Sequence, residues 1–109
     1  MEPAQIVEES ALEAALAAPR FLLFKHSHRC GISTRAFRTY EIFCESHTDV
    51  PTGWLDVVAQ RDWSLRVAER TGVGHQSPQA IWIRRGAVAW HASHTRITRE
   101  ALEALETPA

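Results

Sequence analysis

Cys30 is the residue of this chain whose type and position are best suited to chemistry. It follows an apolar run typical of a strand, residues 21–26, and it precedes a run typical of a helix. At such a strand-to-helix turn, unpaired backbone N–H groups and the positive end of the helix dipole favour a thiolate over a thiol. The sequence therefore predicts that Cys30 is a nucleophile.

The residues around Cys30 are expected to stabilise its thiolate. His28 and Arg29 bring positive charge next to the sulfur, which lowers the pKa of a cysteine. Gly31 would permit a close backbone approach or an unusual dihedral angle at the turn. Ser33 would either hydrogen-bond the thiolate or satisfy a free backbone amide. Because Ser33 stands where a CxxC motif has its second cysteine, the predicted redox chemistry is monothiol.

Cys44 is expected to be a packed core thiol rather than a partner of Cys30. It lies at the edge of an apolar helix face that includes Tyr40. A disulfide needs Cα atoms about 4.4–6.8 Å apart, whereas the two cysteines would lie roughly 21 Å apart along one helix. No internal disulfide is therefore predicted.

Ser77, Pro78 and His94 are the candidate substrate-binding residues. A cis bond before Pro78 would turn the backbone N–H and C=O of Ser77 toward Cys30, where an extended substrate could form two strand-like hydrogen bonds. His91 and His94 line the end of the last strand, where their imidazoles could contact an anionic co-substrate or cap the sheet. The sequence thus predicts a substrate groove beside Cys30.

The histidines also raise the alternative of a metal site. His26, His28 and Cys30 would share one face of an extended strand. However, zinc spacings of the CxxC type do not occur, and no second cysteine is near in the sequence. No metal site is therefore predicted.

The elements that must position these residues alternate between helix and strand. Helices are predicted over residues 8–18 with Ser10 as a cap, 32–46, 62–70 with Asp62 as a cap, and from Thr98 to Leu105. Strands are predicted over residues 21–26, 54–60, 80–84 and 87–91, with a hairpin turn at Arg85-Gly86. This order predicts an α/β chain with a thioredoxin-like fold. We expect a four-stranded mixed sheet with residues 21–26 central, helices on both faces and an extra N-terminal helix.

The composition predicts one soluble domain. The 109 residues carry a formal charge of −1 and are 45% hydrophobic, which suits a single domain over residues 1–109 with its core at about 20–106. The near-neutral charge argues against nucleic acid as a partner, and no apolar run approaches the ~20 residues that span a bilayer, so no membrane partner is expected. A charged N-terminal segment does not suit a signal peptide. This favours a cytoplasmic location, where both cysteines stay thiols between reactions.

Three segments together resemble the monothiol bacilliredoxin family over about residues 21–98. They are Phe24-Lys25-His26-Ser27-x-x-Cys30-x-Ile32-Ser33, His75-x-Ser77-Pro78-Gln79 and Trp90-His91-Ala92-Ser93-His94. The family consists of thioredoxin-like proteins of the bacillithiol system. The resemblance implies that Cys30 attacks mixed disulfides on client proteins and removes bacillithiol from them. Bacillithiol would be a co-substrate, no cofactor would be tightly bound, and the partners would be bacillithiolated clients and a low-molecular-weight thiol.

Two alternatives stay open at this point. The family commonly has Thr-Cys-Pro-Ile-Ser, whereas Gly31 follows Cys30 here, which resembles the Cys-Gly-Phe-Ser of monothiol glutaredoxins. One alternative is therefore a glutaredoxin-like protein that uses glutathione or bridges an iron–sulfur cluster. Against it, Ser93-His94-Thr95 follows the last strand in place of the glycine pair with which such proteins bind glutathione. The other alternative is a non-catalytic thioredoxin-like adaptor, which predicts an unreactive Cys30.

Overall fold

A four-stranded mixed sheet lies between two pairs of helices in the computed structural model, which describes residues 3–28 and 31–106. The elements, in chain order, are α1 (Glu9–Ala17), β1 (Arg20–His26), α2 (Gly31–Ser46), β2 (Thr52–Asp56), α3 (Arg61–Thr71), β3 (Gln79–Arg84), β4 (Ala87–Ser93), the 3-10 helix η1 (His94–Arg96) and α4 (Arg99–Glu103). The strand order is β2-β1-β3-β4, with β1 and β2 parallel and the other pairs antiparallel. The predicted order of elements and the central position of residues 21–26 are confirmed.

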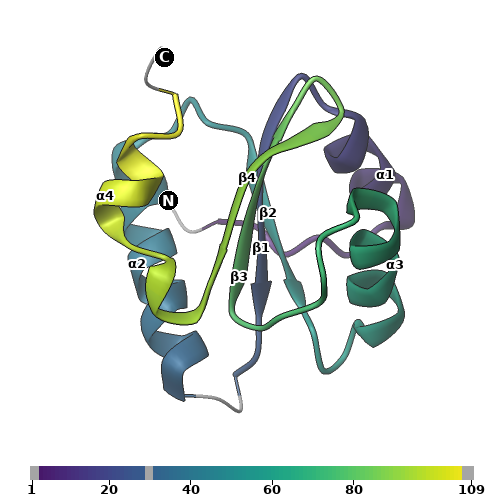
Figure 1. Cartoon of the computed structure of the whole chain (residues 1–109), viewed down its shortest axis with the longest axis horizontal. Helices are drawn as coiled ribbons and strands as arrows, with labels where there is room; N and C mark the ends of the chain where they lie inside the picture. Colours follow the sequence, from purple (N-terminus) through teal and green to yellow (C-terminus); the bar gives the residue numbers. More distant parts are fainter. Residues whose placement is uncertain (1–2, 29–30, 107–109) are drawn as a thin grey trace.

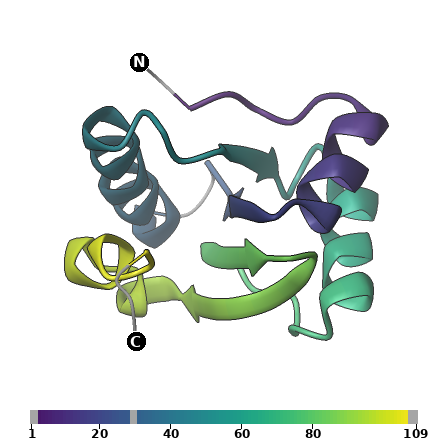
Figure 2. The ribbon, with the colours of Figure 1, turned by 90° about the horizontal axis from the view of Figure 1, so that it is seen from above.

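The sheet has a separate apolar layer on each face. Helices α2 and α4 cover one face, and α1 and α3 cover the other (Figures 1 and 2). Leu22 and Phe24 of β1 pack in the layer of α2 and α4, whereas Leu23 packs in the layer of α1 and α3. Because β1 is buried on both faces, its sequence shows no alternation of apolar and polar residues.

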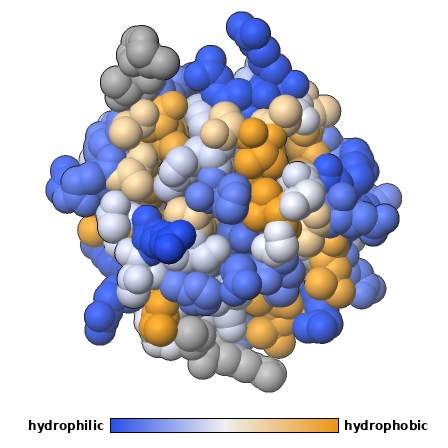
Figure 3. Space-filling view, viewed as in Figure 1, coloured by the Kyte–Doolittle hydropathy of each residue, from blue (hydrophilic) through white to orange (hydrophobic). Residues whose placement is uncertain are grey.

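The two edge strands of the sheet, β2 and β4, differ in whether another segment of the chain covers them. The segment before α1 runs along β2, where the Ile6 N–H donates to the Trp54 carbonyl at 2.8 Å and the Trp54 N–H donates to the Ala4 carbonyl at 3.2 Å. Gly53 permits this close approach, because a Cβ atom there would lie 2.8 Å from the Ile6 side chain. At the opposite edge, β4 has exposed or half-exposed residues at most positions, and the face in front of it mixes polar and apolar groups (Figure 3).

The hairpin and the end of α3 follow the predicted turn chemistry. Arg85 (φ 54°) and Gly86 (φ 72°) are both left-handed, which matches the right-handed twist of the strands that they join. Trp82 and Trp90 are direct partners across this hairpin. Gly72 ends α3 with a φ of 75°. The predicted hairpin is confirmed.

The second strand begins and ends earlier than the sequence predicts. It spans Thr52–Asp56, whereas the predicted range is residues 54–60. The Asp56 carboxylate ends it by accepting hydrogen bonds from the N–H groups of Val58 (2.9 Å) and Ala59 (3.1 Å). These bonds turn the chain toward α3, so an apolar stretch after residue 56 could not continue the strand.

Two of the three predicted helix caps are wrong. Ser10 and Asp62 lie inside α1 and α3, and the N-cap positions belong to Glu8 and Gln60, whose side chains make no capping bond. Thr98 is confirmed, because its hydroxyl accepts the Ala101 N–H at 3.1 Å. The last strand also runs past the predicted residue 91 to Ser93 and leads into η1, which the sequence did not predict.

Candidate active site

The candidate substrate residues meet at the edge of the sheet where β1 ends. The Ser77–Pro78 peptide bond is cis, as predicted. The next residue, Gln79, is the cross-strand partner of Lys25 near the end of β1. The His94 N–H donates to the Pro78 carbonyl at 3.0 Å, which holds the end of β4 against the cis-proline. Ser77, Pro78 and His94 therefore lie together.

The start of α2 lies at this same edge. Helix α2 begins at Gly31 and packs against η1, so its first turns run beside the end of β4 (Figure 1). Arg29 and Cys30 lie outside the described residues. By sequence, Cys30 directly precedes the first residue of α2, so its predicted place at a helix N-terminus agrees with where this helix begins.

The Ser33 hydroxyl joins the start of α2 to the end of β1 and the residue that follows it. It is fully buried, accepts a hydrogen bond from the Ser27 N–H at 2.8 Å and lies 2.9 Å from Nδ1 of His26. The His26 ring in turn stacks on Phe37, with ring centroids 4.3 Å apart. Of the two predicted uses of Ser33, the structure shows the bond to a backbone amide, and a bond to the thiolate stays a prediction.

We expect Ser33→Ala to weaken both the fold and the reaction without stopping the reaction. The substitution leaves the partly buried Ser27 N–H without its acceptor, and the cost should lie at the low end of about 1–3 kcal/mol because water can partly replace the hydroxyl. Because the bond holds the turn beside Cys30, the rate of thiol exchange should also fall. Urea unfolding and single-turnover exchange measure the two effects, with Ser10→Ala as the control because Ser10 is exposed on α1. Unchanged stability and rate would show that the Ser33 bonds are dispensable.

His28 lies beside a carboxylate rather than alone at the turn. Its Nδ1 is 3.4 Å from Oδ2 of Asp56, at the end of β2, and the His28 side chain is 60% exposed. A protonated His28 is thus partly neutralised by Asp56. Its predicted role in stabilising the Cys30 thiolate stays a prediction.

The space around Gly31 does not require glycine, because a Cβ atom there would have no neighbour within 4 Å in the described part of the chain. The unusual dihedral angle and the close backbone approach considered for Gly31 stay predictions. The next residue, Ile32, is 49% exposed.

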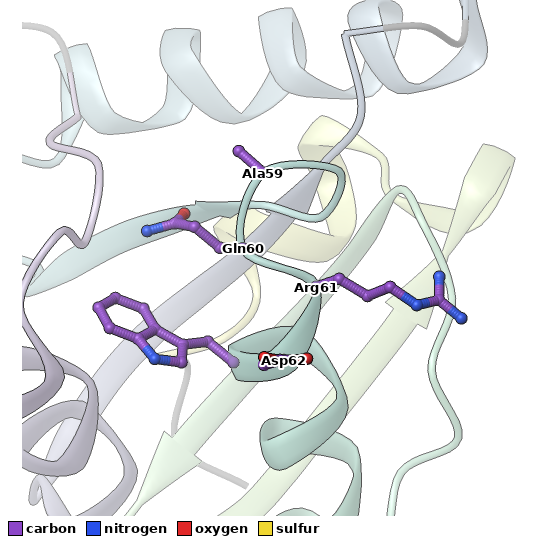
Figure 4. Close-up of a pocket in the computed structure, with 5 residues that line it drawn as sticks. Ala59, Gln60, Arg61 and Asp62 are labelled. Carbon is purple, nitrogen blue, oxygen red and sulfur yellow. The ribbon is translucent and has the colours of Figure 1, made fainter.

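One pocket outside this edge was not predicted from the sequence. It has a volume of about 300 Å³ and lies at the start of α3, where Ala59, Gln60, Arg61, Asp62 and Trp63 line it (Figure 4). The Gln60 amide is already engaged, because it donates to the Ile6 carbonyl at 2.6 Å and its oxygen accepts the Asp56 N–H at 2.9 Å. This pocket contains none of the predicted site residues.

Comparison with known proteins identifies the protein family of this chain. The family described as monothiol bacilliredoxin BrxC matches residues 4–102. The chain belongs to the monothiol bacilliredoxin family. The family match and the fold support thiol–disulfide redox function for this protein.

Solved structures confirm the thioredoxin fold. A protein described only by its thioredoxin fold and a provisional assignment as an oxidoreductase is 28% identical, with a TM-score of 0.86, and the match covers 95% of this chain and 93% of that one. A mutant thioredoxin from Halobacterium salinarum is 20% identical (TM-score 0.72; 95% and 87% covered). Reduced desulfothioredoxin from Desulfovibrio vulgaris Hildenborough is also 20% identical (TM-score 0.70; 96% of both chains covered).

Cys44 of this bacilliredoxin is a core thiol, as predicted. It is buried in the layer beneath α2, and burial is the main cause that raises its pKa to about 11, with hydrogen bonds to Thr52 and Tyr40 acting in the opposite direction. It lies on the same helix as Gly31, roughly 20 Å further along. Cys44 is therefore a poor nucleophile and is remote from the start of α2.

Sequence reasoning missed a buried lysine next to the bacilliredoxin site. Lys25 is fully buried, its Nζ lies 3.1 Å from Nδ1 of His75, and burial lowers its pKa to about 8. The pKa of His75 is lowered too, first by burial and then by the positive charges of Lys25 and Arg61. The signal is present in the sequence, because a lysine interrupts a strand that is predicted to be buried on both faces.

The described residues of this family member contain no cluster of three or more histidine, cysteine or acidic side chains that could hold a metal ion. His26, one of the ligands considered above, is instead hydrogen-bonded to Ser33. Within the same residues, no helix is both long and apolar enough to cross a membrane.

Proposed function

We propose that this protein is a monothiol oxidoreductase that removes bacillithiol from mixed disulfides on client proteins through Cys30. The observation that carries the proposal is the cis Ser77–Pro78 bond at the edge of the sheet where α2 begins, directly after Cys30 in the sequence. This arrangement would place an extended client strand beside a cysteine at a helix N-terminus. The family match supports the same reaction class.

The proposed reaction is one thiol–disulfide exchange. The Cys30 thiolate attacks the bacillithiol sulfur of the mixed disulfide, and the bond between that sulfur and the client sulfur breaks. The client leaves as a thiolate and takes a proton from water, while bacillithiol stays bound to Cys30 in a new disulfide. A second molecule of bacillithiol then attacks this disulfide, which releases oxidised bacillithiol and regenerates Cys30.

The surrounding residues have separate roles in this proposal. Ser77 and Pro78 position the client, and His94 contacts the small thiol. His28, Arg29 and the start of α2 at Gly31 stabilise the thiolate, and Ser33 holds the turn through Ser27. This cycle requires reduced thiols, which suits a cytoplasmic location.

Intact-mass spectrometry after competition between two disulfides tests the co-substrate. The protein is mixed with equal concentrations of oxidised bacillithiol and oxidised glutathione, and the mass added to Cys30 identifies the thiol that it took. We expect the bacillithiol adduct to dominate. A dominant glutathione adduct would favour the glutaredoxin-like alternative, and an unmodified Cys30 would favour the adaptor.

A further inference from the structure

Two exposed arginines at the candidate active site have no acidic partner among the residues that the structure describes. Five other arginines form ion pairs with Asp or Glu side chains: Arg20, Arg38, Arg66, Arg70 and Arg99. Arg35 on α2 and Arg96 on η1 have no ion pair within residues 3–28 and 31–106, and both are exposed. Their guanidinium groups are therefore available to an external anion.

The two arginines lie on opposite sides of one turn, which is formed by His94 and Thr95. A pocket of about 170 Å³ lies on the side of α2, and Arg35 lines it together with His94 and Thr95. A larger pocket of about 460 Å³ lies on the other side of the turn, and Arg96 lines it together with His91, His94 and Thr95. Among the described residues that line the two pockets there is no Asp or Glu, so nothing there repels an anion.

The turn itself is held in place by the cis-proline loop. The His94 N–H bond to the Pro78 carbonyl fixes the start of η1, and His94 adopts a left-handed φ of 55°, which is uncommon for a residue other than glycine. Such backbone conformations are concentrated at functional sites. Figure 3 shows hydrophilic side chains together with apolar ones in the lower part of this face, where β4 ends in Figure 1.

We propose that Arg35 and Arg96 bind carboxylate groups of the small thiol that Cys30 removes from its clients, with the His94–Thr95 turn between them. This inference rests on the proposed function and adds to it the residues that would recognise the anionic groups of the co-substrate. An arginine recognises a carboxylate through two parallel N–H donors, which neither histidine nor lysine can offer. The volume of the larger pocket is in the range of sites for small ligands, about 300–1,000 Å³.

The test compares an anionic and a neutral disulfide in single-turnover reactions with Cys30. The anionic probe is oxidised bacillithiol, which carries carboxylates, and the neutral probe is hydroxyethyl disulfide. Arg35→Gln and Arg96→Gln each remove a charged contact to a carboxylate and should each lower the second-order rate constant with oxidised bacillithiol by about 5- to 10-fold. The effect is not larger because solvent weakens the contacts of exposed guanidinium groups. The double variant should show roughly the product of the two effects. Rates with hydroxyethyl disulfide should change less than about twofold.

Arg84→Gln is the matched control, because Arg84 is exposed at the far end of β3 from Pro78. It should leave both rates unchanged. Added salt should slow the wild-type reaction with oxidised bacillithiol more than the reaction with hydroxyethyl disulfide. Equal slowing of both probes in the arginine variants, or no slowing in either, would overturn the anion site while the chemistry of Cys30 stands. A wild-type protein that reacts with neither probe would overturn the proposed function itself, and this inference with it.

Discussion

We expect Cys30→Ser to abolish the proposed release of bacillithiol from a modified client, and Cys44→Ala to leave it largely intact. The first substitution removes the nucleophile, because a serine hydroxyl is not ionised at neutral pH and does not exchange with disulfides. The second removes a thiol that is buried, whose pKa is raised to about 11 and which lies far along α2 from Gly31. Release of bacillithiol from a client, followed by mass spectrometry, measures both effects.

Alkylation of the native protein provides an independent control for the same assignment. Iodoacetamide at neutral pH should add one label to the native wild-type protein and none to Cys30→Ser, while both should gain a label at Cys44 in denaturant. During turnover, the intermediate that accumulates should carry one bacillithiol. A Cys30–Cys44 disulfide as an obligatory intermediate, together with an inactive Cys44→Ala variant, would replace the monothiol mechanism by a dithiol one.

The fold was predictable because its signals are local. The unbroken apolar run of β1 predicts a strand that is covered on both faces, and it is a central strand of the sheet. Arg85-Gly86 supplies the two left-handed residues that a tight hairpin needs. The limits of β2 were not predictable in this way, because they depend on the Asp56 carboxylate bonding to Val58 and Ala59.

The candidate site was predictable only where one segment carries its own signal. Ser77-Pro78 before a strand predicted the cis bond, and the bond is cis. By contrast, the link between the Ser33 hydroxyl and Ser27 joins two elements, and its geometry follows from how α2 packs on β1. The contact of Lys25 with His75 joins residues 50 positions apart, so it required the folded chain.

Lys25→Met should stabilise the protein by about 3 kcal/mol at pH 7, which is the second large effect that we expect. Burial lowers the pKa of Lys25 from 10.5 to about 8, so the folded protein binds the Lys25 proton less tightly than the unfolded chain does. Each unit of such a shift corresponds to about 1.4 kcal/mol. Below pH 8 the folded state therefore carries the full cost of a buried charge, and methionine removes this cost at a similar volume.

The pH dependence of this gain separates the charge of Lys25 from simple repacking. Because the pKa is lowered on folding, wild-type stability should rise relative to the variant as pH increases from about 8 to 10.5, and the difference should vanish above that range. The raised pKa of Cys44 makes the folded state less stable above pH 9 in both proteins, so it cancels in the difference. Urea unfolding at several pH values measures this difference, with Leu23→Met, in the same apolar layer, as a control that should show no dependence on pH. A Lys25→Met protein that is less stable than the wild type at pH 7 would show that the Lys25 contact with His75 outweighs the cost of burying the charge. A gain that stays constant with pH would show that repacking, and not removal of the charge, stabilises the variant.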